Sequence, residues 1–118
     1  MSWYLAKIIY RIICGEGDHT AQFDEQLRMI QAESGNQAIE KAIELGEKEQ
    51  ETFYNNNQQL VQWKFINVSE IYEVSELIDG AEIYSRIHET DDAFSYLKFV
   101  SWKADVLKMQ QKPLLKII

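Results

Sequence analysis

The segment V-Q-W-K-F-I-N-V-S-E-I-Y-E-V, Val61 to Val74, decides the fold that this sequence predicts. Its apolar residues occupy odd positions up to Phe65 and even positions from Ile66 onward. Because side chains alternate between the two faces of a strand, a slip of one residue sends every later side chain to the opposite face. A β-bulge between Phe65 and Asn67 would keep both halves directed at the core. We therefore predict one long, bent core strand.

Trp63 and Tyr72 allow a second interpretation of this segment, in which the two rings form a platform for a ligand. Aromatic side chains at strand spacing belong to a core far more often than to a site. We expect both rings to lie in the core.

Composition places the chain among ordinary globular domains. With 118 residues it is long enough to bury a core, and we expect one α+β domain over residues 1–118. Nineteen acidic residues against twelve basic ones give a formal charge of -7, which opposes broad contact with phosphate. We therefore do not expect nucleic-acid binding, and a charged partner would be basic.

Cys14 is the single cysteine, so the chain has neither an internal disulfide nor a multi-cysteine zinc site. The N-terminal sequence does not resemble a signal peptide, and no apolar run approaches the roughly 20 residues that span a bilayer. These features predict a cytoplasmic protein without a membrane partner. Phosphate loops, dinucleotide turns and serine-nucleophile motifs are also lacking in the sequence, so we expect no cofactor.

The rest of the chain shows alternating and helical apolar patterns. We predict strands at about residues 3–13, 23–32 and 83–87, and helices at about 34–54 and 92–109. Ser34 with Gln37 is a capping-box pair at the start of the first helix. The core face of the first strand consists of Tyr4, Ala6, Ile8, Tyr10 and Ile12. The order strand, strand, helix, strand, strand, helix predicts a mostly antiparallel four-stranded sheet with the helices covering one face.

Four short motifs resemble those of a known family. They are W-Y-x-A-K (residues 3–7), A-E-S-x-x-x-A-x-x-K-A (32–42), V-x-W-x-F-x-x-V (61–68) and D-G-x-E-x-Y-S (79–85). In this order they resemble domain of unknown function 4288. The resemblance implies a shared fold and supplies no catalytic residues. The loop at residues 15–20 and everything after Glu89 depart from the pattern, so residues 1–89 are the family-like part and residues 90–118 a C-terminal helix and tail.

The loop from Cys14 to His19 contains the strongest chemical candidates. Cys14 with His19 could form a nucleophile and its base, and Glu16, Asp18 and His19 could bind a metal. Neither spacing matches a known catalytic or metal motif. A cysteine at the end of a strand is more often a small buried hydrophobe, so we predict no catalytic, metal or cofactor residues.

Two polar surfaces are weaker candidates. Tyr84, Arg86 and His88 would project from one strand face and could bind a small ligand, although solvated strand faces often have this composition. A negative stripe on the first helix would face solvent or a basic partner. It consists of Glu40, Glu44, Glu47 and Glu51.

The second predicted helix has apolar residues on two opposite sides. One side would cover the sheet and consists of Ala93, Tyr96, Leu97, Val100, Ala104 and Leu107. Phe99, Trp102 and Val106 lie on the other side, where a monomer has nothing to cover them. The alternative is that the tail at residues 114–118 folds back over them. Lysines between residues 98 and 116 make this region locally basic.

These patterns favour a small non-enzymatic protein that acts through protein contacts, either as a homodimer or as an acidic partner-binding module. The alternative is a small-ligand-binding protein or minor enzyme. Such a protein would use the Tyr84, Arg86 and His88 face or the Cys14 to His19 loop.

Overall fold

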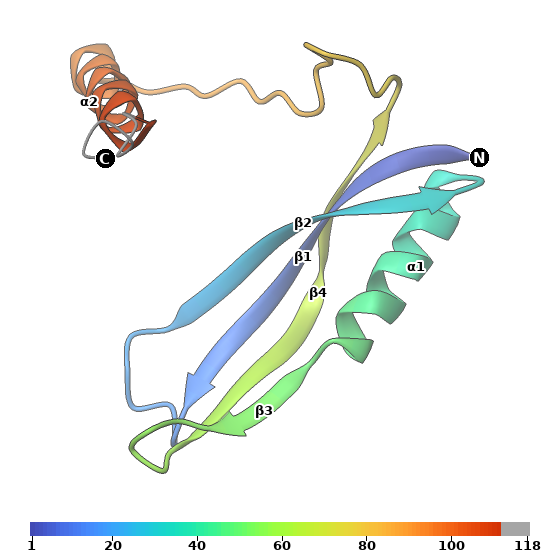
Figure 1. Ribbon diagram of the computed structural model, residues 1–118, viewed down its shortest axis with the longest axis vertical. Helices are drawn as coiled ribbons and strands as arrows, with labels where there is room; N and C mark the ends of the chain where they lie inside the picture. Colours follow the sequence, from blue (N-terminus) through green and yellow to red (C-terminus); the bar gives the residue numbers. More distant parts are fainter. Residues whose placement is uncertain (112–118) are drawn as a thin grey trace, which may run out of the picture. The chain divides into compact units, whose positions relative to one another are not determined.

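The computed structural model describes residues 1–111. By its contacts the chain divides into two compact units, Met1–Ser85 and Arg86–Ile118. The first unit contains β1 (Ser2–Cys14), β2 (Gln22–Ala32), α1 (Gly35–Lys48), β3 (Glu51–Tyr54) and β4 (Leu60–Val74), and the second contains α2 (Ala93–Gln111) (Figure 1). The predicted α+β class and the order of strands and helices are confirmed. A single domain over residues 1–118 stays a prediction.

The sheet is antiparallel throughout, with strand order β2-β1-β4-β3. β1 and β2, which correspond to the strands predicted at about residues 3–13 and 23–32, form a long hairpin in which Tyr4 lies opposite Ile30. Gly15 and Gly17 take positive φ angles of 61° and 84° in the connecting loop, where residues with a Cβ would be strained. The glycines therefore explain why the chain reverses at this point.

β4 is the long, bent strand that the opening segment predicts. Its register against β1 shifts twice, so that Ile66 and Ser69 have no partner in β1. The shift at Ile66 is the predicted bulge and is confirmed, whereas the shift at Ser69 was not predicted. Because each bulge reverses the alternation, Tyr72 and Val74 lie on the opposite face from Phe65. The prediction that both halves of the strand point inward is therefore wrong for its last residues.

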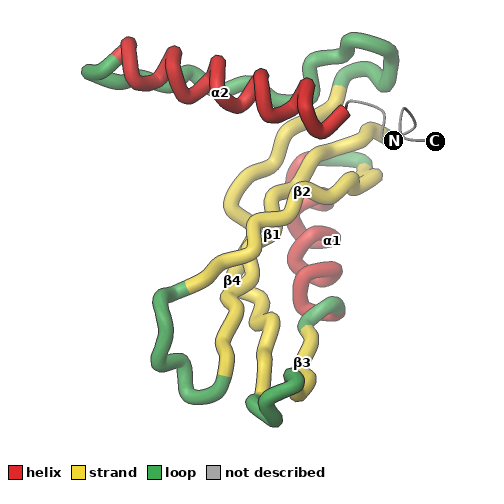
Figure 2. Tube along the Cα trace, turned by 60° about the vertical axis from the view of Figure 1, so that its left-hand side comes forward, coloured by secondary structure: helices red, strands yellow, loops and turns green. Residues whose placement is uncertain are grey.

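The core lies between α1 and one face of the sheet (Figure 2). α1 can approach the strands closely because its buried residues are Ala38, Ala42 and Gly46. The Tyr10 hydroxyl donates a hydrogen bond to the Gly46 carbonyl at 2.9 Å, which fixes the helix against β1. The predicted core face of β1 is confirmed for Tyr4, Ala6, Ile8 and Tyr10, which are buried, whereas Ile12 is half-buried. The prediction that α2 also covers the sheet stays a prediction.

Two predicted elements are wrong. α1 ends at Lys48, not Tyr54, because residues 51–54 form β3 and pair with β4, with Phe53 opposite Val61. The strand predicted at residues 83–87 is not present in the structure. A strand needs a hydrogen-bonded neighbour, and the backbone bond described near this stretch is a turn, from Ala81 N–H to Ile78 O at 3.0 Å.

α2 begins at Ala93, close to the predicted start near residue 92. Asp92 Oδ1 accepts a hydrogen bond from the Ser95 N–H at 3.0 Å, and Asp92 Oδ2 accepts from the Ser95 hydroxyl at 2.6 Å. These bonds lower the pKa of Asp92 and satisfy a free amide of the first turn. Among the residues that the structure describes, neither helix has the length and apolarity needed to cross a bilayer.

Candidate functional site

A recess of about 310 Å³ lies beyond the end of α1, on the face of the sheet that the helix covers. Alternate residues of β2 reach it because Asp24, Gln26 and Arg28 share one face of that strand. Its walls include three aromatic and two acidic side chains. The lining residues are Tyr10, Gln26, Arg28, Glu49, Glu51, Phe53 and Trp63.

A continuous chain of polar contacts crosses this recess. Trp63 Nε1 donates to Asp24 Oδ2 at 3.0 Å, and Gln26 Nε2 donates to the same oxygen at 2.7 Å. Arg28 donates to Gln26 Oε1 at 3.0 Å and pairs with the Glu49 carboxylate at 2.6 Å. These contacts therefore link β4 and β2 to Glu49, the residue that follows α1.

The electrostatics of the recess follow from these partners. Hydrogen bonds from Gln26 and Trp63 hold the pKa of Asp24 below its usual value. Burial, reinforced by the charge of Glu49, raises the pKa of Tyr10. Asp24, Arg28 and Glu49 each have a partner within this network of contacts, so the network orients the Trp63 ring and links β2 to β4.

The structure separates Trp63 from Tyr72. Trp63 is half-buried on the face that α1 covers and stacks on Phe53, with ring centroids 6.2 Å apart. Tyr72 lies on the opposite face, where its ring meets Tyr84 edge-on at 5.1 Å. Its hydroxyl donates to the Glu70 carboxylate, which raises the pKa of Tyr72 to about 12. The two rings form no common platform.

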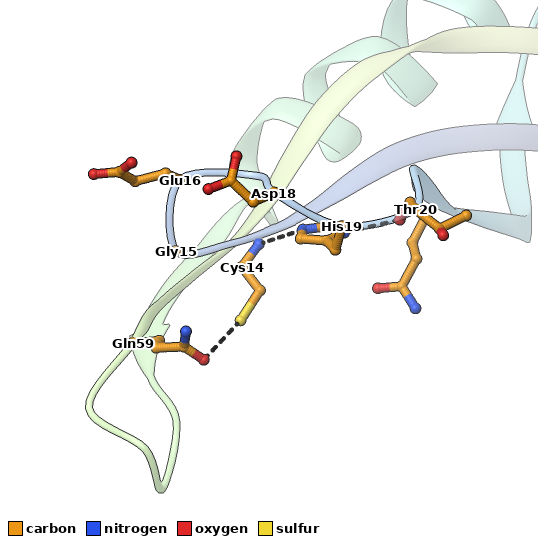
Figure 3. A pocket seen from close by; sticks show the side chains of 8 residues that line it. Cys14, Gly15, Glu16, Asp18, His19, Thr20 and Gln59 are labelled. Atoms are coloured by element: carbon orange, nitrogen blue, oxygen red, sulfur yellow. Dashed lines mark hydrogen bonds between the residues drawn. The ribbon is translucent and has the colours of Figure 1, made fainter.

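The loop after β1 is held by its own side chains (Figure 3). His19 Nε2 accepts a hydrogen bond from the Cys14 N–H at 3.0 Å, and His19 Nδ1 lies 2.8 Å from the Thr20 carbonyl oxygen. In this arrangement Nε2 serves as the acceptor and Nδ1 as the donor of the ring. The Cys14 thiol lies instead 3.5 Å from Gln59 Oε1 and from Asn55 Nδ2.

These contacts limit what the loop can do chemically. An open recess of about 680 Å³ lies beside Cys14 and His19. As a base for the thiol, His19 would first have to release a backbone partner, because both ring nitrogens are engaged. Within residues 1–111, no three His, Cys, Asp or Glu side chains gather closely enough to hold a metal ion. The visible role of His19 is to close the hairpin.

The residues of the predicted ligand face do not project from one strand. Tyr84 packs on Tyr72 in the first unit. Arg86 and His88 belong to the second unit, where the His88 ring stacks on Tyr96 with centroids 5.0 Å apart. As a row on a strand this face is a wrong prediction, because residues 83–87 have no ladder to align them.

The predicted acidic stripe is shorter than expected. Glu40, Glu44 and Glu47 are exposed on α1, whereas Glu51 lies in β3. A basic partner for the three helical carboxylates stays a prediction.

α2 exposes the apolar side chains that the sequence indicates. Phe99 is 52% and Trp102 60% exposed, and their rings lie 6.1 Å apart at 30°. Val106 is half-buried. No residue described in α2 is buried. The tail at residues 114–118, predicted as an alternative cover for this surface, lies outside the described residues.

A family match covers most of the chain. Residues 3–85 match the family described as Domain of unknown function (DUF4288). No curated protein and no solved structure matches the chain.

Proposed function

Because the chain belongs to the DUF4288 family, whose description gives no activity, we propose a function from the surface of the molecule. The protein is a non-enzymatic module that acts through protein contacts, and it forms a homodimer through the apolar stripe of α2 (Phe99, Trp102 and Val106). The observation that supports this most strongly is a 19-residue helix that buries none of its described residues. An apolar helix without cover costs free energy in water, so it favours a partner.

The spacing of the stripe suits a second helix. Phe99, Trp102, Val106 and Met109 are three, four and three residues apart, the spacing of a coiled-coil seam. Phe and Trp each present about 150 to 250 Å² of surface for burial. The same residues on a second copy would offer a surface of equal shape, as a two-fold contact requires.

The opposite side of α2 has a second seam with the same spacing, formed by Leu97, Val100, Ala104 and Leu107. A helix that has an apolar seam on each of two sides is normally covered on both. One partner helix against the first seam leaves this second seam for another contact. The arrangement supports assembly over an isolated monomer.

We also propose that the protein works in the cytoplasm. Cys14 is half-buried and free, and a lone thiol is suited to a reducing compartment. The alternative function, a small ligand in the recess beside Cys14 and His19, is supported by the volume of that recess. A thermal-shift screen against metals and metabolites tests it, and a ligand that protects the protein but not Cys14→Ser would favour it.

Light scattering on a sizing column tests the α2 contact. At tens of micromolar protein, Trp102→Glu is expected to lower the molar mass by half, because a carboxylate would have to be buried in the seam. Ser101→Glu adds the same charge to the preceding residue, outside the seam, and is expected to leave the mass unchanged. A monomeric wild-type protein, or equal masses for both variants, contradicts the proposal.

A further inference from the structure

β2 is an edge strand with the features of a pairing surface. It runs for 11 residues, and among residues 1–111 it pairs with β1 and with no second strand, because the strand order is β2-β1-β4-β3. Long, exposed edge strands present unpaired N–H and C=O groups that can add a further strand. The β2 edge (Gln22–Ala32) is therefore a surface to which a further strand could be added.

The structure shows which residues of β2 direct their backbone groups outward. Gly15 N–H donates to Leu60 O at 2.8 Å, so odd residues of β1 bond toward β4 and even ones toward β2. Even residues of β1 pair with even residues of β2, as in Tyr4 with Ile30. Odd residues of β2 thus face the free edge, and consistently the Lys41 ammonium donates to the Gln31 carbonyl.

The odd residues also expose an apolar row. Phe23 and Leu27 are each 53% exposed, and Met29 is 43% exposed. Side chains of one strand face lie about 7 Å apart, so these three form a row along the edge on the face opposite α1. A further strand at this edge would bury the apolar side chains and form hydrogen bonds with the free backbone groups.

A second copy of β2 pairs well with the first in one antiparallel register. Centring the two-fold axis on Asp24, Glu25 or Arg28 would place like charges opposite each other, which is destabilising. Centring it on Leu27 would place Asp24 opposite Ile30. Centring it on Gln26 places Asp24 opposite Arg28, a pair of opposite charges, and Phe23 opposite Met29, an apolar pair, and each pair occurs twice. The same register places the uncharged Gln22 opposite Ile30.

In this register Arg28 and Asp24 can each form an additional ion pair with the second copy. Arg28 already pairs with Glu49 at 2.6 Å, but its guanidinium has five donors. Asp24 accepts two hydrogen bonds on Oδ2, which leaves Oδ1 for the Arg28 of the second copy. Glu25, which would lie opposite Leu27, is paired with Lys7 at 2.6 Å in its own chain. The register therefore leaves no carboxylate of β2 without a cation or donor.

We infer that two copies of this chain join through antiparallel pairing of their β2 edges, centred on Gln26, so that the two four-stranded sheets become one continuous sheet. The contact uses the sheet of the first unit and is independent of the α2 contact. The β2 edge is complementary to a second copy of itself. Asp24 of each copy lies opposite Arg28 of the other, and Phe23 lies opposite Met29.

Disulfide trapping tests both the contact and its register. In a Cys14→Ser background, Gln26→Cys places two thiols across a non-hydrogen-bonded pair, where the Cα atoms lie about 4.5 Å apart and a disulfide fits. Leu27→Cys is the matched control. Its two copies would be offset by about 6.6 Å along the strands in addition to a strand spacing of about 4.8 Å, beyond the Cα limit of roughly 7 Å.

Under mild oxidation at low micromolar protein, Gln26→Cys is expected to form most of its chains into a covalent dimer, and Leu27→Cys less than one tenth as much. Equal crosslinking of both, faster crosslinking of Leu27→Cys, or none with either overturns the inference. Repeating the experiment with Trp102→Glu separates the two contacts. Crosslinking that persists there supports the β2 edge even if the α2 contact fails, and crosslinking that disappears assigns the association to α2.

Discussion

At the scale of the residue, Gly46 shows how closely α1 approaches the sheet. A Cβ at this position would overlap the ring of Phe65, which is itself held against Tyr10 by an edge-on contact at 6.1 Å. The Gly46 carbonyl also accepts the Tyr10 hydroxyl. Glycine is therefore required here by packing, although its conformational freedom costs helix stability.

We predict that Gly46→Ala destabilises the protein. The higher helix propensity of alanine would by itself stabilise the helix by about 0.5 to 1 kcal/mol, but overpacking against Phe65 costs about 1 to 3 kcal/mol. The free energy of unfolding from urea denaturation should therefore fall. Gly35→Ala is the control, because its added Cβ meets nothing within 4 Å, and it should not destabilise. A Gly46→Ala protein as stable as Gly35→Ala would contradict the packing.

At the scale of the element, α1 depends on its first turn. Ser34 has extended backbone angles, and its hydroxyl accepts the Gln37 N–H at 3.2 Å. The Gln37 side chain accepts the N–H of Glu33 at 2.5 Å, one residue before the partner that a capping box predicts. The cap is formed from both sides, as Ser34 and Gln37 in the sequence indicate.

We predict that Ser34→Ala lowers the free energy of unfolding by about 1 kcal/mol, because an amide of the first turn loses its acceptor. Ser34→Asp should restore most of this, since a carboxylate also accepts that hydrogen bond and favours the positive end of the helix. Urea denaturation followed by circular dichroism measures both variants. A Ser34→Ala protein with an unchanged midpoint would show that the cap contributes little.

β4 shows why part of an element can be predicted from the sequence and part cannot. The bulge at Ile66 is visible because apolar positions change from odd to even there. The bulge at Ser69 leaves no such signal in the sequence, because apolar residues such as Tyr72 and Val74 can occupy either face of the sheet. Tyr72 faces away from α1 because the register shifts place it opposite Leu5, and its ring there contacts Tyr84. β3 was missed for a related reason, since four residues pair with β4 through contacts that local sequence does not encode.

At the scale of the whole molecule, the proposed α2 and β2 contacts are two independent two-fold interfaces. A chain that uses both should assemble in even numbers, with at least four chains at saturating concentration. The apolar stripe of α2 could be predicted from helical spacing alone. The β2 edge could not, because only the strand order shows which strand lies outermost.

We predict that combined variants reduce the assembly stepwise. Leu27→Pro removes an outward N–H of the β2 edge, where proline is tolerated, and should leave dimers joined by α2. Trp102→Glu should leave dimers joined by β2, and the double variant should be a monomer. Light scattering gives the three masses, and circular dichroism shows whether each variant is folded. A folded double variant that still associates would mean that a different surface joins the chains.

The network of Asp24, Trp63 and Arg28 could not be predicted for the same physical reason. Asp24 and Trp63 are 39 residues apart, and their hydrogen bond exists because β1 places β2 and β4 on its two sides. A local pattern shows which face a side chain occupies, but the register between distant strands decides which side chains meet.

The sequence by itself determined the α+β class, the strands β1, β2 and β4, the core face of β1, the bulge at Ile66 and the apolar stripe of α2. Each of these depends on the spacing of neighbouring residues, which fixes the direction of side chains locally. Only the tertiary structure decided the second bulge, the short strand β3, the backbone contacts that engage His19, and the position of β2 at the edge. These depend on pairing between distant segments, and the free energy of such pairing comes from contacts that do not exist until the chain has folded.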